Sequence, residues 1–153
     1  MTVLPPEELH RLHQLITWEY PPPTSSALEG RACTWCGTAT DESAISMSPL
    51  DPCRICLTCY TGQLAWFATW YDWHSHVLGC AHCRHGRTCY VGRGRRTLHE
   101  LTVEAAHREL ICFSCHEPLE DTEPALPVLW MGDSRGYPGY VDAPCLTKEA
   151  AAR

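Results

Sequence analysis

The sequence predicts a small, metal-stabilised α+β protein built from tandem zinc fingers behind an N-terminal helix. Eleven of its 153 residues are cysteine, and Cys-x-x-Cys recurs without a fixed period, at 33/36, 53/56, 56/59, 80/83 and 112/115. Three helical patterns precede two short strand-like runs. Units this small bury too little apolar surface to offset their ordering entropy, so we expect metal ions to stabilise them.

Composition and charge narrow the class of protein. The chain has no apolar run of the roughly 20 residues that cross a membrane, and its N-terminus has neither the basic start nor the apolar core of a secretory signal. We therefore expect a cytoplasmic chain without a membrane partner, where reduced thiols favour metal binding over disulfides. With a formal net charge of −6, contact with nucleic acid would need a local basic patch.

Residues 1–20 are expected to form an N-terminal helix. Leu9, Leu12 and Ile16 recur at the spacing of one helical face. We expect this face to pack on the chain's own body, and docking on a partner is the alternative. The helix should end at the prolines that open residues 21–31, which are expected to be a linker.

Residues 56–77 predict a second helix, rich in tryptophan. Trp66, Trp70 and Trp73 lie on one face, and the helix is apolar nearly all round. A small body needs such rings as core, so packing within the chain is the first expectation. Because tryptophan is enriched at interaction hot spots, the alternative is a protein–protein adaptor, or a homodimer, that uses this face.

A third helix is expected over residues 97–110. Thr97 and Glu100 resemble the capping box of a helix start. The residues expected to face inward are Leu98, Leu101, Ala105 and Leu110. Further along, the segments VLWMG (128–132) and GYV (139–141) predict two short strands.

The first candidate metal site pairs Cys33 and Cys36 with Cys56 and Cys59. Two Cys-x-x-Cys pairs, separated by nineteen residues, supply four soft ligands for a tetrahedral zinc ion. The second pair lies at a helix start, where the helix dipole stabilises thiolates. Cys53 is left over, and a Cys53/Cys56 pair is the alternative wiring.

The order of these two pairs resembles the N-terminal zinc-binding domain of the ClpX chaperone family, over residues 31–70. The resemblance rests on CTWCG, which starts at Cys33, and on ICLTC, which ends at Cys59 and leads into an apolar helix. It implies a treble clef, a fold often used to bind proteins, within residues 32–77. No ATP-binding motif follows, so the ATPase activity of that family is not implied.

The second candidate site combines Cys80, Cys83 and Cys89 with His76, which lies one helical turn before Cys80. Three cysteines and one histidine suit a zinc ion. Other histidines compete for the fourth position: His74, His82, His85 and His99. This zinc unit should span residues 78–110, with a basic loop and the third helix.

The spacing Cys-x2-Cys-x5-Cys also resembles the WhiB-like proteins of actinobacteria, which hold a [4Fe–4S] cluster with a fourth, more distant cysteine. Cys59 could supply that ligand. Eleven arginines against one lysine indicate a high-GC source, such as an actinobacterium or its phage. The Gly-Val-Trp-Gly-Gly turn of that family is missing, since YVGRGRR occupies residues 90–96. An iron–sulfur regulator is therefore the minor alternative.

The third candidate site joins Cys112 and Cys115 to Asp142 and Cys145. This spacing resembles a PARP-type finger and, more loosely, half of a LIM domain, in which His rather than Asp precedes the last cysteine. An Asp oxygen can bind zinc, and His116 could replace it. The third zinc unit should span residues 111–147, and residues 148–153 are expected to be a tail.

A rival wiring joins Cys80, Cys83, Cys112 and Cys115 in one site. It would leave Cys89 and Cys145 unused, whereas three sites use ten of the eleven cysteines. We therefore expect two or three zinc ions, and three is the preferred number.

The sequence does not predict an enzyme or a small-molecule substrate. A site of four thiolates has no open position for a reacting water. There is no His-Glu-x-x-His, and no His-x-Glu precedes Pro52-Cys53 as a deaminase would require. Phosphate-binding and dinucleotide-binding loops are also missing.

Nucleic acid is the expected partner of a basic loop that follows the second site. The loop has five arginines and no acidic residue, and Tyr90 within it could stack on a base. The expected nucleic-acid-binding residues are Arg84, Arg87, Arg93, Arg95 and Arg96. The sequence thus favours a zinc-binding regulator resembling transcription regulators.

Overall fold

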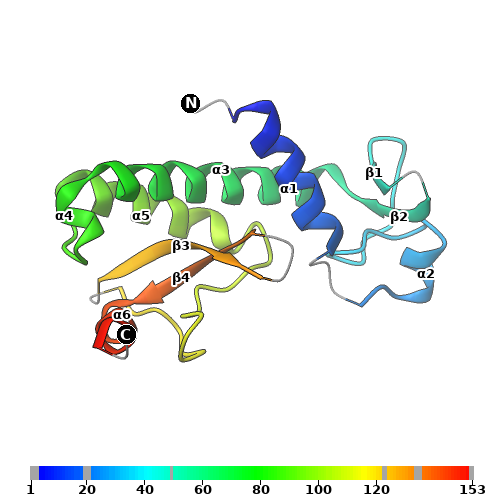
Figure 1. Ribbon diagram of the computed structural model, residues 1–153. Coiled ribbons are helices and arrows are strands. Elements are labelled where there is room, and N and C mark those ends of the chain that lie inside the picture. Colours follow the sequence, from blue (N-terminus) through cyan, green and yellow to red (C-terminus); the bar gives the residue numbers. More distant parts are fainter. Residues whose placement is uncertain (1–3, 19–21, 49, 122–123, 133–135, 152–153) are drawn as a thin grey trace. The chain divides into compact units, whose positions relative to one another are not determined.

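A computed structural model describes residues 4–18, 22–48, 50–121, 124–132 and 136–151 of the chain. Its contacts divide the chain into two units, Met1–Ala68 with Glu104–His107, and Thr69–Val103 with Arg108–Arg153. As predicted, the class is α+β. The described elements, coloured along the chain in Figure 1, are α1 (Pro6–Trp18), α2 (Ser25–Leu28), β1 (Ile45–Ser48), β2 (Asp51–Ile55), α3 (Leu57–Gly79), α4 (Ala81–Arg84), α5 (Tyr90–Val103), β3 (Ala125–Met131), β4 (Gly136–Asp142) and α6 (Ala143–Ala151).

Helix α1 confirms the predicted N-terminal helix, although both ends of the predicted range lie outside the described residues. It buries Leu12 and Leu15. Leu9 is 39% exposed, so its placement on the inner face was wrong, and the side chain of Ile16 lies outside the description. Helix α1 therefore packs on the rest of its unit through Leu12 and Leu15.

The segment expected to be a linker contains the short helix α2. The Thr24 hydroxyl accepts a hydrogen bond from the Ala27 N–H at 3.2 Å, which is the usual way in which threonine starts a helix. Ala27 is buried. The linker interpretation gave weight to the prolines and overlooked this cap.

The hairpin of β1 and β2 leads directly into α3 in the first unit. The strands are antiparallel, with Ile45 opposite Ile55. Because β2 ends at Ile55 and α3 begins at Leu57, Cys56 lies in the junction between strand and helix. No alternating pattern in the sequence predicted these two strands.

Helix α3 confirms the predicted tryptophan-rich helix. Trp66, Trp70 and Trp73 are at most 3% exposed, so their rings belong to the core, as first expected. The Trp70 indole N–H donates to the Gly139 carbonyl at 3.2 Å, which satisfies its polar edge. The adaptor alternative, which would need this face exposed, stays an untested prediction.

Helix α5 corrects the predicted third helix, since it begins at Tyr90 rather than at Thr97 and ends at Val103. Thr97 is not a cap, because its hydroxyl donates to the Arg93 carbonyl one turn earlier. Most of the expected basic loop is therefore helical. Its glycines suggested a loop, but tertiary contacts outweigh that local preference.

The inner face of α5 is polar. The described buried residues of this helix are Gly92, Arg96 and His99, whereas Leu98 and Leu101 are 59% and 75% exposed. Ala105 is also exposed, Leu110 is half-buried, and the buried alanine is Ala106. The predicted inner face was wrong because Arg96 and His99 find polar partners inside the second unit.

These partners come from several elements of the second unit. His99 Nδ1 lies 2.9 Å from the Thr69 hydroxyl, and its Nε2 is hydrogen-bonded to the Tyr140 hydroxyl. Arg96 donates to Glu100 at 2.6 Å and to the Glu120 carbonyl at 2.9 Å. A buried charge or ring nitrogen with such partners is tolerated in a core.

Strands β3 and β4 confirm the two predicted strands and extend them. They pair antiparallel from Ala125 opposite Asp142 to Met131 opposite Gly136. Strand β4 runs directly into α6, so the described start of the expected tail is helical. None of the described helices is long and apolar enough to cross a membrane.

Candidate metal centres

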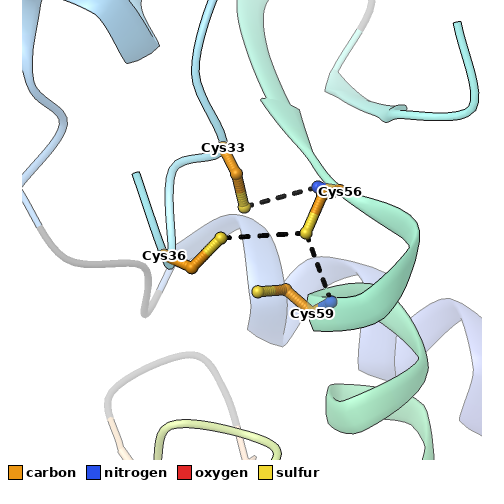
Figure 2. A group of neighbouring side chains, drawn as sticks. All are labelled: Cys33, Cys36, Cys56 and Cys59. Carbon is orange, nitrogen blue, oxygen red and sulfur yellow. Dashed lines mark hydrogen bonds between the residues drawn. The ribbon is translucent and has the colours of Figure 1, made fainter. Parts of the chain in front are cut away.

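The first centre consists of Cys33, Cys36, Cys56 and Cys59, whose sulfurs all lie within 4.8 Å of one another. Figure 2 shows these four side chains converging from two segments, the turn after Cys33 and the start of α3. The turn is closed by a hydrogen bond from the Cys33 N–H to the Thr38 carbonyl at 2.7 Å. It also needs the left-handed backbone of Gly37, whose φ is +73°.

Backbone N–H groups point at the sulfurs of the first centre. The Cys56 N–H donates to Cys33 Sγ at 3.3 Å, and the Cys59 N–H donates to Cys56 Sγ at 3.5 Å. Both are drawn in Figure 2. These donors lie at the start of α3, where the helix dipole also favours negative charge, so they stabilise the thiolates that a metal requires.

The thiols of the first centre differ in acidity. Desolvation would raise the pKa of Cys36, but hydrogen bonds with Thr38 and neighbouring cysteines lower that pKa to about 6. The Thr38 hydroxyl lies 3.2 Å from Cys36 Sγ. Burial raises the pKa of the Cys59 thiol. A metal ion would therefore compete with protons least at Cys36.

His107 also reaches the first centre, although it was not among the predicted site residues. Its Nε2 lies 3.5 Å from Cys59 Sγ. The residue has a left-handed backbone with φ +52°, and the preceding turn is fixed because Gln63 donates to the Ala106 carbonyl. A side chain at Gly62 would collide with the Ala105 carbonyl. No spacing signal links His107 to a cysteine 48 residues away.

The second centre consists of His76, Cys80, Cys83 and Cys89, whose ligand atoms also lie within 4.8 Å of one another. His76 comes from the last turn of α3, and its Nε2 lies 3.2 Å from Cys89 Sγ and 3.6 Å from Cys83 Sγ. Cys80 Sγ lies 3.9 Å from Cys89 Sγ. The competing histidines His74, His82, His85 and His99 are not in the group.

The start of α5 packs directly against the second centre. The Gly92 N–H donates to Cys89 Sγ at 3.3 Å. A Cβ at Gly92 would lie 2.9 Å from Cys83 Sγ, so a larger residue would force this sulfur of the second centre to shift. Burial raises the pKa of Cys83 to about 11, and a bound cation would offset this cost by favouring the thiolate.

The third centre consists of Cys112, Cys115, Asp142 and Cys145, with ligand atoms within 4.8 Å of one another. Asp142 Oδ2 lies 3.3 Å from Cys115 Sγ, while Oδ1 accepts from the Cys145 N–H at 2.8 Å. This N–H lowers the pKa of Asp142. Hydrogen bonding with Asp142 raises the pKa of the Cys145 thiol to about 12.

The first and third centres are built in the same way, although the sequence shows no fixed period. In both, a turn closes after the first cysteine. The Cys33 N–H donates a hydrogen bond to the Thr38 carbonyl, and the Cys112 N–H donates to the Glu117 carbonyl. Each turn pairs in parallel with the last strand of a hairpin, Cys33 beside Arg54 and Cys112 beside Tyr140. A helix then follows in each case, with the third ligand just before its start and the fourth ligand in its first turn.

The correspondence extends to single residues. The left-handed residue of the turn is Gly37 in the first centre and His116, with φ +61°, in the third. His116 therefore serves the backbone of the turn and is not in the ligand group. Asp142 occupies the position of Cys56. The segment that holds the hairpin differs in length, so the ligand pairs are separated by twenty-six residues in the third centre and by nineteen in the first. This difference hides the structural repeat in the sequence.

The structure thus brings the twelve residues expected as ligands into three groups of four. Cys53 is buried in β2 and outside the groups, and Cys59 lies in the first group. The rival wiring of Cys80 and Cys83 with Cys112 is not formed. These groups could hold metal ions.

The five arginines expected to bind nucleic acid have different surroundings. Arg96 is buried and paired with Glu100, so the prediction for Arg96 was wrong. Arg95 forms an ion pair with Asp72 at 2.8 Å. The other three side chains are exposed, and within the described residues they form no ion pair: Arg84, Arg87 and Arg93.

Comparisons of the chain with protein-family models, with curated proteins and with solved structures found no match. The resemblances drawn from short cysteine motifs therefore identify no family. The three groups of four ligand residues show a possible metal-binding protein.

Proposed function

We propose that this chain is a zinc-binding protein in which three zinc ions stabilise the two units. The observation that carries the proposal is the convergence of twelve ligand atoms into three sets, each within 4.8 Å. Four ligands around one tetrahedral zinc place sulfurs about 3.8 Å apart. The sulfur–sulfur distances of 3.6 to 3.9 Å in the first and second centres agree with this value.

The compact sets favour single ions over an iron–sulfur cluster. A [4Fe–4S] cluster places four irons and four sulfides between its ligands, so the cysteines must be more widely spaced than around one ion. Thiolate-rich sets with one imidazole or carboxylate are typical of zinc. The order of turn, hairpin and helix in the first and third centres also supports the treble-clef interpretation.

The proposed role of the zinc ions is structural. Each set supplies four protein ligands, which fill a tetrahedral ion and leave no position for a reacting water. The described hydrophobic core around the third centre is small: Cys112, Val141 and Cys145 with Leu119, Val128 and Leu146. Structural zinc contributes on the order of 10–16 kcal/mol of apparent binding energy per site.

Native mass spectrometry of the purified chain tests this proposal. We expect three zinc ions per chain, and loss of helical circular dichroism when all are removed with a strong chelator. Detection of iron with sulfide in the purified chain would refute the proposal. An unchanged circular dichroism spectrum and melting temperature in the metal-free chain would also refute it. Re-addition of zinc, with magnesium as the control, distinguishes metal loss from irreversible damage.

Nucleic-acid binding is a second candidate function, favoured by the exposure of Arg84, Arg87 and Arg93 around the second centre. Tyr90 is 93% exposed beside them, and no acidic residue interrupts residues 73–99. Such a patch can neutralise phosphates and stack on a base even in an acidic chain. We propose this patch as the contact surface of a zinc-stabilised regulator.

Salt-titrated binding of single-stranded and duplex DNA and RNA tests the patch. The triple substitution of Arg84, Arg87 and Arg93 by alanine should abolish binding and its salt dependence. Arg31→Ala is the control, because Arg31 is exposed but paired with Glu29. Absence of binding by the unmodified, zinc-loaded chain at low salt would exclude this function without affecting the zinc proposal.

A further inference from the structure

The first and third centres form a natural comparison of two metal sites that differ in one ligand. Their turns and following helices correspond, as described above. The burial of corresponding ligands is also the same, with the first and last cysteines buried, the second exposed and the third ligand half-buried. The third ligand is the one that differs, being Cys56 in the first centre and Asp142 in the third.

Charge does not distinguish the two centres. Four thiolates, or three thiolates and one carboxylate, bring the same four negative charges to a divalent ion. The difference is the donor atom, because a carboxylate oxygen is a harder ligand than a thiolate sulfur. Zinc, cadmium and copper(I) bind thiolates strongly, so exchange of sulfur for oxygen weakens their binding in otherwise equal surroundings.

The hydrogen bonds of Asp142 limit it further. Its Oδ1 already accepts the Cys145 N–H at 2.8 Å, which is the position in which Cys56 Sγ accepts the Cys59 N–H at 3.5 Å. Its Oδ2 lies 3.3 Å from Cys115 Sγ. Because Oδ1 is engaged by this N–H, we expect Asp142 to bind an ion mainly through Oδ2, as a single hard ligand in place of the sulfur.

We propose that Asp142 makes the third centre an exchangeable metal site, which releases zinc before the first centre does and discriminates more weakly in favour of cadmium. This inference rests on the proposed zinc-binding function. Changes around a metal ligand typically alter affinity by about 10- to 100-fold, so a changed ligand should give at least about a tenfold difference in release rate. The hairpin β3–β4 and α6 would then loosen when zinc is withdrawn.

The experiment follows zinc release from the full, zinc-loaded chain with a colorimetric chelator. Cysteines are trapped by N-ethylmaleimide at successive times and located by peptide mass spectrometry. We expect Cys112, Cys115 and Cys145 of the unmodified chain to be labelled at least about tenfold sooner than Cys33, Cys36 and Cys59. This labelling requires no variant, so it holds even if a substitution fails to fold.

Reciprocal substitutions test the role of the ligand itself. Asp142→Cys should slow release from the third centre to the rate of the first, and Cys56→Asp should speed release from the first to the rate of the third. The preference for cadmium over zinc should rise at the third centre of Asp142→Cys and fall at the first centre of Cys56→Asp. Equal labelling of both centres in the unmodified chain, or faster labelling of the first, would overturn the inference. A chain that takes up fewer than three zinc ions even in excess zinc would instead count against the proposed function.

Discussion

His107 Nε2 lies 3.5 Å from Cys59 Sγ, although 48 residues separate them in the chain. In the tautomer with the proton on Nε2, this ring N–H would donate to the Cys59 thiolate of a metal-loaded centre, which would withdraw charge from the sulfur and stabilise the ligand. The contact joins the turn of residues 104–107 to the first centre within one unit.

Replacement of His107 by alanine should weaken metal binding at the first centre by about tenfold or more, because such outer contacts typically contribute that much. Competition with a chelator of known affinity measures the change, with cysteine labelling to identify the site. His107→Gln, which keeps an N–H donor, should restore part of the affinity. His10→Ala is the control, since His10 is exposed and lies beside Gln14. Equal affinities for all these chains would show that the contact has no role.

Gly92 and Gly94 give opposite predictions for the same substitution on one helix. At Gly92 an added Cβ would lie 2.9 Å from Cys83 Sγ, whereas at Gly94 nothing lies within 4 Å. Gly92→Ala should therefore distort the second centre, and Gly94→Ala should raise helix stability by up to about 1 kcal/mol. Cobalt substitution with visible absorption reports the geometry, and thermal unfolding reports the stability. A normal cobalt spectrum in Gly92→Ala would contradict the packing.

Thr38 controls how the first centre responds to acid. Hydrogen bonding with Thr38 contributes to lowering the pKa of Cys36 from 9.0 to about 6. The stabilised thiolate is present above the folded-state pKa and is lost as pH falls through it. We expect Thr38→Val to raise that pKa, so that protons would displace a bound metal at a higher pH.

A pH titration of the cobalt-loaded chain, followed by the thiolate-to-cobalt absorption band, measures this shift. Thr38→Ser keeps the hydroxyl and is the matched control, so its midpoint should stay with that of the unmodified chain. If Thr38→Val releases cobalt at the same pH as Thr38→Ser, the hydroxyl has no effect on the centre.

Tyr140 is expected to matter for stability through its hydroxyl. The hydroxyl is hydrogen-bonded to His99, which is 0% exposed. Tyr140→Phe leaves a buried ring nitrogen without this partner, which should lower the free energy of unfolding by about 1–3 kcal/mol. Tyr137→Phe is the control and should change it by less than about 0.5 kcal/mol. Denaturant unfolding of the zinc-loaded variants makes the comparison, and equal stabilities would refute the role.

The ligand groups could be predicted because paired cysteines at short spacing leave few alternatives. Even Asp142 could be identified, since it precedes Cys145 at the required distance. The sequence left the wiring open because spacing cannot show which pairs share an ion. The backbone decides this, through the hairpins that bring distant pairs together.

The start of α5 could not be predicted from local preference. Gly92 and Gly94 are poor helix formers, yet the first of them is required because α5 begins against the sulfurs of the second centre. The exposed Leu98 and the buried His99 reverse the usual hydrophobic pattern because His99 is hydrogen-bonded inside the second unit. Polar partners from Thr69 and Tyr140 are distant in sequence, so no periodicity could reveal them.

Helix α3 carries Cys59 in its first turn and His76 in its last, so in the proposed zinc-bound chain a different ion would hold each end of this single helix. Loss of one ion should fray the helix from that end only, while the other end remains folded. The helical signal of the chain should therefore fall in steps during metal withdrawal, and the steps from the first and second centres should each report the fate of one end of α3.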